Sequence, residues 1–278
     1  MQFSMRRARL AAAFLTLMVA TACSSWDTPG AGLENYDSLM RIGDGQRAND
    51  DPMGAVNVYR KAQALNPKSP DPPIRIGQSM LAAGGNAEAA AAFQEALKLK
   101  PGNGEALRGL GAALIAMDQP ALALAQFDLA TTMDPTDIRA LNGAGVALDL
   151  LGRHAEAQGK YQAALERDQG YVSARNNLGL SQAVSGDYAA AIATLSPLTG
   201  AVGGAGGTPR TRGNLALAYG LQGDMANAAR WLRADLDEPS VQRYLIYFGR
   251  LRSATPEVRT ESIRANPEYF PRPAAARR

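Results

Sequence analysis

The stretch Asn103–Thr136 reads NGEALRGLGAALIAMDQPALALAQFDLATTMDPT, and its pattern of small and large apolar residues returns at a fixed interval along the chain. One glycine, Gly111 in this stretch, sets the phase, which holds over five copies. An alanine stands at a constant distance after each glycine, and a large apolar residue follows four positions later, as Ala123 and Phe127 do here. A fixed period of about 34 residues is typical of arrays in which each copy is one small structural unit. This period therefore predicts a fold made of repeated structural units.

Several positions of the repeat carry the pattern. The phase-setting glycines are Gly43, Gly77, Gly111, Gly145 and Gly179. The alanines are Ala55, Ala89, Ala123, Ala157 and Ala191, and the large apolar residues are Tyr59, Phe93, Phe127, Tyr161 and Leu195. Four copies continue with Ala62, Ala96, Ala130 and Ala164, and three end at Pro67, Pro101 and Pro135. This combination of small, large and helix-breaking residues indicates closely packed helix pairs.

These positions resemble the tetratricopeptide repeat, a unit of two antiparallel helices. Glycine on the first helix and alanine on the second remove bulk where the helices cross, and the aromatic residue fills the space toward the next pair. Proline cannot continue a helix interior, which suits it to end the three copies in which it occurs. The resemblance implies an all-α fold, a right-handed superhelix of about six helix pairs plus a capping helix.

The predicted array occupies residues 36–252. A sixth copy, from about Arg210 to Pro239, is displaced by three residues after a glycine-rich stretch at 200–207, which we expect to be a loop. A last amphipathic helix over Ser240–Arg252 is expected to cover the apolar end of the stack. Residues 253–278 are rich in proline and arginine and are expected to lack regular structure, with Tyr269–Phe270 exposed there.

Residues 1–22 are typical of a signal peptide, with three arginines followed by the apolar run Leu10–Ala22. As a helix this run would span about 20 Å, against about 30 Å of bilayer hydrocarbon. The region ending at Cys23 resembles the lipobox of bacterial lipoproteins, with Ala20 where leucine is usual. That resemblance implies lipidation of Cys23, a flexible tether over residues 23–35 and, from Ser24, sorting to the periplasmic face of the outer membrane. The alternative is an ordinary secretory signal that leaves a free thiol.

Composition argues against most site chemistry. The chain contains one cysteine and one histidine, so zinc sites, His-containing nucleophile relays and CxxC pairs cannot be assembled. The arginines of the signal account for the net charge of +3 and leave 26 basic and 26 acidic residues, which disfavours nucleic-acid binding. His154 lies in a predicted turn, where we expect a solvated side chain. We predict no enzyme activity, catalytic residue, cofactor, metal or small-molecule substrate.

A binding surface is expected on the concave face, which the first helix of each repeat lines. Counting from the phase-setting glycines predicts that amide and basic side chains point into this groove. They are Arg75, Arg108, Arg139, Asn142, Asn176, Asn177 and Asn214. Such groups can hydrogen-bond the backbone and carboxylates of a peptide, so a protein client is expected. A solvated groove without a specific ligand remains the alternative.

The combination of lipid anchor and repeats resembles the TadD-type lipoproteins of tight-adherence (Flp) pilus systems. The resemblance covers residues 10–252, and its more particular part is the stretch NLALAYG at 214–220, followed by 224–235 and the Tyr244–Leu245 helix. It implies a periplasmic assembly factor that binds the pilus secretin subunit and is held at the membrane by its lipid. A general envelope scaffold and a regulatory subunit of an envelope enzyme are the alternatives.

Overall fold

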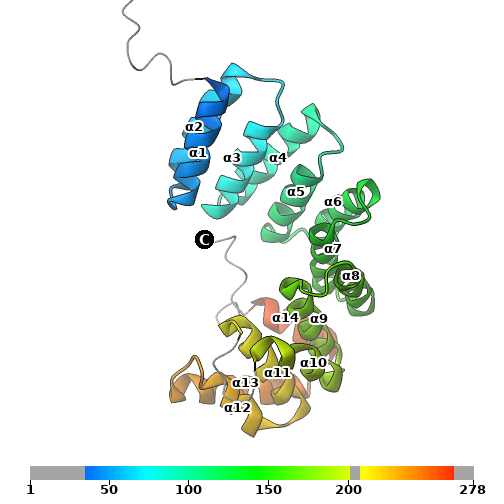
Figure 1. Ribbon diagram of the computed structural model, residues 1–278. Helices are drawn as coiled ribbons and strands as arrows, with labels where there is room; N and C mark the ends of the chain where they lie inside the picture. The colour runs from blue at the N-terminus through cyan, green and yellow to red at the C-terminus, as the bar shows by residue number, and fades with distance from the viewer. Residues whose placement is uncertain (1–34, 201–206, 266–278) are drawn as a thin grey trace, which may run out of the picture. The chain divides into compact units, whose positions relative to one another are not determined.

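The computed structural model describes residues 35–200 and 207–265, which form fourteen α-helices and one short 3-10 helix, with no strand among them (Figure 1). The helices are α1 (Tyr36–Ala48), α2 (Pro52–Leu65), α3 (Asp71–Ala82), α4 (Asn86–Leu99), α5 (Gly104–Ala116), α6 (Pro120–Met133), α7 (Ile138–Leu150), α8 (His154–Arg167), α9 (Val172–Ser185), α10 (Tyr188–Leu195), the 3-10 helix η1 (Ser196–Thr199), α11 (Pro209–Gln222), α12 (Met225–Leu232), α13 (Glu238–Arg252) and α14 (Pro256–Ala265). The all-α prediction is confirmed.

Local sequence determines where these helices begin. Asn35, Asn103 and Asp137 precede α1, α5 and α7, and the side chain of each accepts a hydrogen bond from a backbone N–H of the first turn. Such caps satisfy donors that have no partner inside the helix. Pro52 and Pro120 stand at the first position of α2 and α6, where a missing N–H costs nothing. The helix starts are therefore encoded locally.

The turn inside each pair has one residue in the left-handed region. These residues are Asp50, Gly84, Asp118, Gly152, Gly186 and Gly223, with φ between 61° and 106°. The first five recur in step with the repeat, and the sixth comes three positions late, which matches the displacement predicted for the sixth copy. Glycine adopts this conformation without steric cost, and aspartate is one of the few other residues that tolerate it.

The repeat glycines lie where aromatic rings enter the array. Phe127 of α6 is 4% exposed, and a Cβ added at Gly111 would lie 2.7 Å from its Cζ. The next pair presents Gly143 to the other side of the same ring, where a Cβ would come closer still. Phe93 lies in the same way between Gly77 and Gly109. Each of these two phenylalanine rings therefore joins its own pair to the following one, and two glycines make the space for it.

Contacts between pairs define the inner face, which we take as the surface of the first helices α1, α3, α5, α7, α9 and α11. Each of these from α3 onward contacts the next first helix, with no comparable contact between successive second helices in the described residues. First helices therefore lie closer together than second helices, and the array bends toward them. Figure 1 shows this curve from α1 to α13.

The sixth pair departs from the first four pairs at both helices. Its second helix, α12, has 8 residues against 14 in α2, α4, α6 and α8. Asp235 stands where a closing alanine is expected, and it accepts two hydrogen bonds from Arg212 of α11, which is 8% exposed. A bidentate ion pair thus replaces the small-residue contact of the earlier copies.

The segment after α13 differs from the sequence-based expectation. Residues 256–265 form α14, which contacts α7, α9 and α13, so the expected lack of regular structure is wrong for this part. The reason is a set of polar contacts to distant helices, which composition does not reveal. The predicted signal peptide and Cys23, most of the predicted tether, most of the glycine-rich loop and Tyr269–Phe270 lie outside the described residues. No helix within the described ranges is long and apolar enough to cross a membrane.

Candidate protein-binding face

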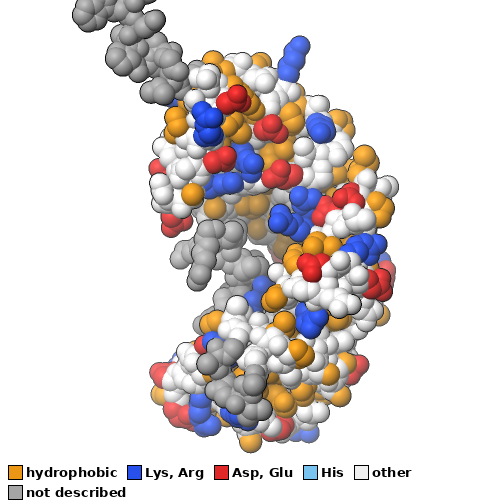
Figure 2. Space-filling view, viewed as in Figure 1, with side chains coloured by type: hydrophobic (Ala, Val, Ile, Leu, Met, Phe, Trp, Pro, Cys, Tyr) orange, Lys and Arg blue, Asp and Glu red, His pale blue; other side chains and the backbone are white. Residues whose placement is uncertain are grey.

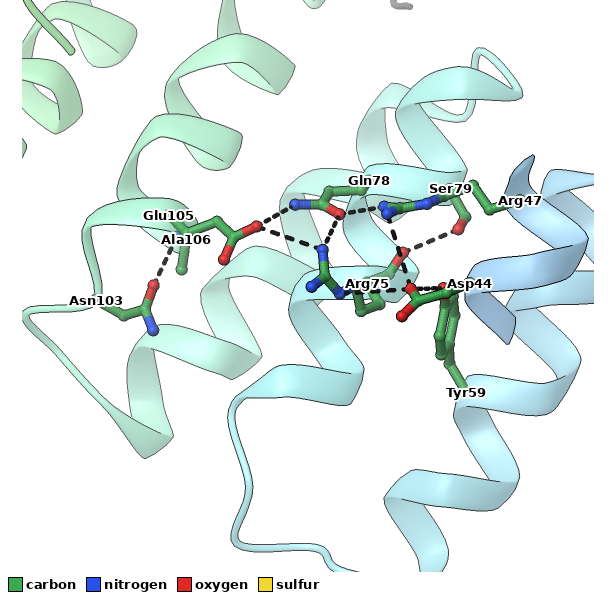
Figure 3. A network of polar contacts seen from close by, with 9 residues as sticks. All are labelled: Asp44, Arg47, Tyr59, Arg75, Gln78, Ser79, Asn103, Glu105 and Ala106. Carbon is green, nitrogen blue, oxygen red and sulfur yellow. Dashed lines mark hydrogen bonds and ion pairs between the residues drawn. The ribbon is translucent and has the colours of Figure 1, made fainter. Parts of the chain in front are cut away.

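A polar network crosses the first three pairs on the inner face (Figure 3). Gln78 of α3 is its centre: its Oε1 accepts from Arg47 of α1 and from Arg75, and its Nε2 donates to Glu105 Oε1 at 2.6 Å. Arg75 also lies 3.7 Å from Asp44 Oδ1 and 3.6 Å from Glu105 Oε1. The side chains of Asp44, Arg75 and Glu105 remain between 33% and 45% exposed. They are positioned by one another and still accessible.

An open cavity of about 320 Å³ lies beside this network. It is lined by Tyr36, Asp37, Met40, Arg41, Asp44, Asp71, Ile74, Arg75 and Glu105. Four carboxylates face two guanidinium groups, so the cavity carries an excess of negative charge and we call it the acidic cavity. Figure 2 shows acidic and basic side chains intermingled over this part of the molecule. Such a site favours a cationic group with an apolar stem.

The arginines predicted for the groove have different surroundings. Arg75 lines the acidic cavity. Arg108 of α5 is hydrogen-bonded to Asp137, whose other oxygen caps the first turn of α7. Arg139 is exposed on α7. Arg75 and Arg108 therefore each connect neighbouring pairs while remaining partly exposed, and Arg139 is exposed.

The predicted asparagines form ladders between first helices. Asn177 of α9 donates to Asn142 of α7 at 3.0 Å and accepts from Arg210 of α11 at 3.3 Å. Asn214 of α11 donates to Asn176 of α9 at 3.2 Å, and these two side chains are only 1% and 5% exposed. The four asparagines thus form two separate hydrogen-bonded pairs between neighbouring repeats, and contact with a client remains a prediction for them.

His154 is buried, so the expectation of a solvated side chain is wrong. It is 8% exposed, with Nδ1 2.8 Å from Asp149 Oδ1 and Nε2 3.0 Å from Thr260 Oγ1 of α14. Asp149 also accepts from Tyr161 at 2.9 Å and from Ser181 at 2.6 Å. The imidazole is covered because α14 folds over this region of α7 and α9. Among the described residues no group of three or more His, Cys, Asp or Glu could hold a metal ion.

Arg259 of α14 was not anticipated from the sequence. It is 7% exposed and donates to three backbone carbonyl oxygens: Leu251 at 3.0 Å, Arg252 at 3.2 Å and Val184 at 3.2 Å. Its guanidinium also lies over the ring of Tyr188, 5.7 Å from the centroid. The repeat period stops before α14, so no spacing signal marks this arginine.

Two buried tyrosines predict a loss of stability in alkali. Burial, reinforced by Asp44 for Tyr59 and by Asp149 for Tyr161, raises the pKa of both phenols. A tyrosine in the unfolded chain ionises near pH 10, whereas a buried tyrosine stays protonated to higher pH. Each buried phenol therefore contributes its full stability below about pH 10, and this contribution is lost as the pH rises toward the pKa of the folded state. Urea denaturation should therefore show a steeper loss of stability above about pH 10 in wild type than in Tyr59→Phe/Tyr161→Phe. An identical pH dependence in the double variant would contradict the assignment.

Comparisons with known proteins agree with this architecture. Two tetratricopeptide-repeat family models match residues 80–144 and 143–205. Comparison with curated protein sequences finds no match. Among solved structures, PilW, a widely conserved type IV pilus biogenesis factor, superposes with a TM-score of 0.68 at 19% identity, covering 76% of this chain and 98% of PilW.

Two further structures have the same fold. PilF of Pseudomonas aeruginosa has a TM-score of 0.63 at 17% identity and covers 76% of this chain and 97% of its own. MamA has a TM-score of 0.51 at 22% identity and covers 58% of this chain and 88% of its own. At these identities the superpositions establish the fold alone. The matched family models and the repeated helix pairs show that the chain contains tetratricopeptide repeats, and the superpositions show that it has the fold of such proteins.

Proposed function

We propose that this protein is a lipid-anchored envelope scaffold for Tad/Flp pilus assembly, which binds a segment of the secretin subunit on its inner face. Tethering through Cys23 would hold that face at the outer membrane and raise its effective concentration toward a membrane client. The resemblance to TadD-type lipoproteins supports the pilus assignment. The shared fold with PilW, a pilus biogenesis factor, is consistent with it.

The acidic cavity is the observation that carries client binding. Three of its charged side chains, Asp44, Arg75 and Glu105, are held in place by the network around Gln78 but remain accessible to a ligand. Its apolar wall includes Ile74, which is 2% exposed, and Met40, which is half-buried. A lysine or arginine of a client could lay its stem on this wall and place its charge among the carboxylates. We therefore propose a client segment with at least one basic side chain at this site.

Co-purification tests this proposal. The variant Asp71→Asn/Glu105→Gln removes two negative charges from the acidic cavity while keeping side-chain size. One charge-assisted contact contributes about 1.5–3 kcal/mol, so we expect capture of the secretin subunit in mild detergent to fall at least about tenfold. Arg108 is unsuitable for this test because its loss would also disturb the cap of α7.

Glu166→Gln, an exposed change on α8, is the matched control and should leave capture unchanged. Equal capture by the cavity variant would reject the acidic cavity as the client site. Failure of wild type to retain the secretin, with another envelope protein bound in its place, would reject the pilus assignment and favour a general envelope scaffold.

A further inference from the structure

Helix α14 lies on the inner face of the fourth and fifth pairs. It contacts α7 and α9 and follows α13 after the three residues 253–255 (Figure 1). Polar contacts hold it along its length: Arg259 to three carbonyls, Thr260 to His154, and Arg264 to Asp118 in the turn after α5. This face of α7 and α9, the part of the array where a client would be expected, is therefore already occupied by a segment of the same chain.

The site that holds Arg259 consists of backbone carbonyl oxygens at the C-terminal ends of two helices. Val184 belongs to the last turn of α9, and Leu251 and Arg252 belong to the last turn of α13. The final carbonyls of a helix lack partners inside it and carry its negative partial charge. No carboxylate pairs with Arg259 among the described residues, so this buried cation is stabilised by two helix ends and by the Tyr188 ring.

The contacts of α14 are few for a helix that belongs to a core. It has 10 residues, and Arg259 is its one buried residue within the described range. Val258 is 52% exposed. The ion pair of Arg264 with Asp118 involves side chains that are 28% and 51% exposed, so it contributes little. Helices of this length are marginal by themselves, and docking must supply their stability.

A cavity of about 140 Å³ remains where α14 meets the array. Its apolar wall includes Val146, Leu180 and Val184 of the array and Ile263 of α14, and Asp149 and His154 lie at the same place. A tightly packed terminal helix would leave no such space. Ile263 packs against the apolar core of the fifth and sixth pairs, and beside this one apolar contact the surface holds α14 through a few directed polar contacts.

We propose that this surface, which we call the α14 site, is a second binding site for a short client helix that carries an arginine, and that α14 is its replaceable occupant. The client arginine takes the place of Arg259 at the ends of α9 and α13. The α14 site rests on the proposed function only for the identity of the protein that supplies the client helix. Because α14 is linked by three residues, its effective concentration is about millimolar or higher, so it blocks the site until a tethered client competes with it.

A labelled peptide tests the proposal without any client. A fluorescein-tagged peptide of residues 254–265 is titrated with the full-length chain in mild detergent, and its anisotropy is measured. We expect the Arg259→Ala chain, in which α14 is released, to bind the peptide at least about tenfold more tightly than wild type, because the internal competitor is gone. The same peptide with Arg259→Ala should bind neither chain. A chain and a peptide with Val258→Ala, an exposed change on α14, should each behave as wild type.

A second variant separates release of α14 from damage to the array. Thr260→Ala/Arg264→Ala removes the contacts to His154 and Asp118 and keeps Arg259, so peptide binding should lie between wild type and Arg259→Ala. Hydrogen exchange of these chains should show faster exchange in α14 with α9 and α13 unchanged. The proposal is overturned if a folded Arg259→Ala chain does not bind the peptide, or if α9 and α13 lose protection or the chain unfolds, because α14 is then a fixed cap. Failure of secretin capture alone would leave the α14 site standing.

Discussion

Phe127→Ala is expected to lower the free energy of unfolding by about 3–5 kcal/mol, the range for removing a buried phenylalanine. The ring is 4% exposed and lies between Gly111 of its own pair and Gly143 of the next. Its loss would open a cavity at the junction of two pairs. In an array stabilised by contacts between neighbours, this weakens both the pair and the interface. Urea denaturation followed by far-ultraviolet circular dichroism measures the change.

A double-mutant cycle between Gly143 and Phe127 tests whether the ring fills the space that the glycine leaves. Gly143→Ala alone places a Cβ against the Phe127 ring, and such overpacking costs about 1–3 kcal/mol. In the Phe127→Ala background the space is free, so the same change should stabilise by about 0.5–1 kcal/mol through helix propensity. The sign of the effect should therefore reverse between the two backgrounds.

Gly159→Ala is the matched control for this cycle. Gly159 lies in α8, is exposed, and a Cβ added to it would meet no atom within 4 Å. It should stabilise by about 0.5–1 kcal/mol in both backgrounds. Additive effects of Gly143→Ala and Phe127→Ala would mean that the ring and the glycine are not coupled, and that the aromatic residue does not join the pairs.

Cys23→Ala should move the protein from the membrane fraction to the soluble fraction. The proposed anchor depends on acyl chains attached to this residue, and a protein with two or more chains is held far more firmly than one without them. Ultracentrifugation of cell lysates followed by immunoblotting measures the distribution. Mass spectrometry of the purified wild-type N-terminus should show the added acyl mass.

Neighbouring substitutions serve as controls for the anchor. Ser25→Ala leaves the lipidation position intact and should remain in the outer membrane. Ser24→Asp should keep the protein lipidated and shift it to the inner membrane if residue 24 directs sorting. A Cys23→Ala protein that stays membrane-bound after signal cleavage would refute the lipid anchor and favour an ordinary secretory signal.

The sequence predicted the helix pairs well because their packing is periodic. The spacing between Gly111 and Phe127 recurs in the first five copies, so the contact can be predicted from the sequence alone. The second glycine against the Phe93 and Phe127 rings was not predicted, although the GxG stretches at 109–111 and 143–145 carried the signal. The acidic cavity was anticipated only at Arg75, because its other charged residues differ from copy to copy.

Thus the sequence by itself determined the number, order and phase of the helix pairs, since each is stabilised by contacts with its neighbours in the chain. Only the tertiary structure decided what the inner face presents. Arg259, Thr260 and Arg264 reach partners 75, 106 and 146 residues away, at Val184, His154 and Asp118. These contacts have no period and depend on the curvature of the whole array, which brings α14 back onto α7 and α9. The physical reason is that the repeating contacts join residues close in sequence. The position of a terminal helix instead depends on the sum of the small rotations between successive pairs.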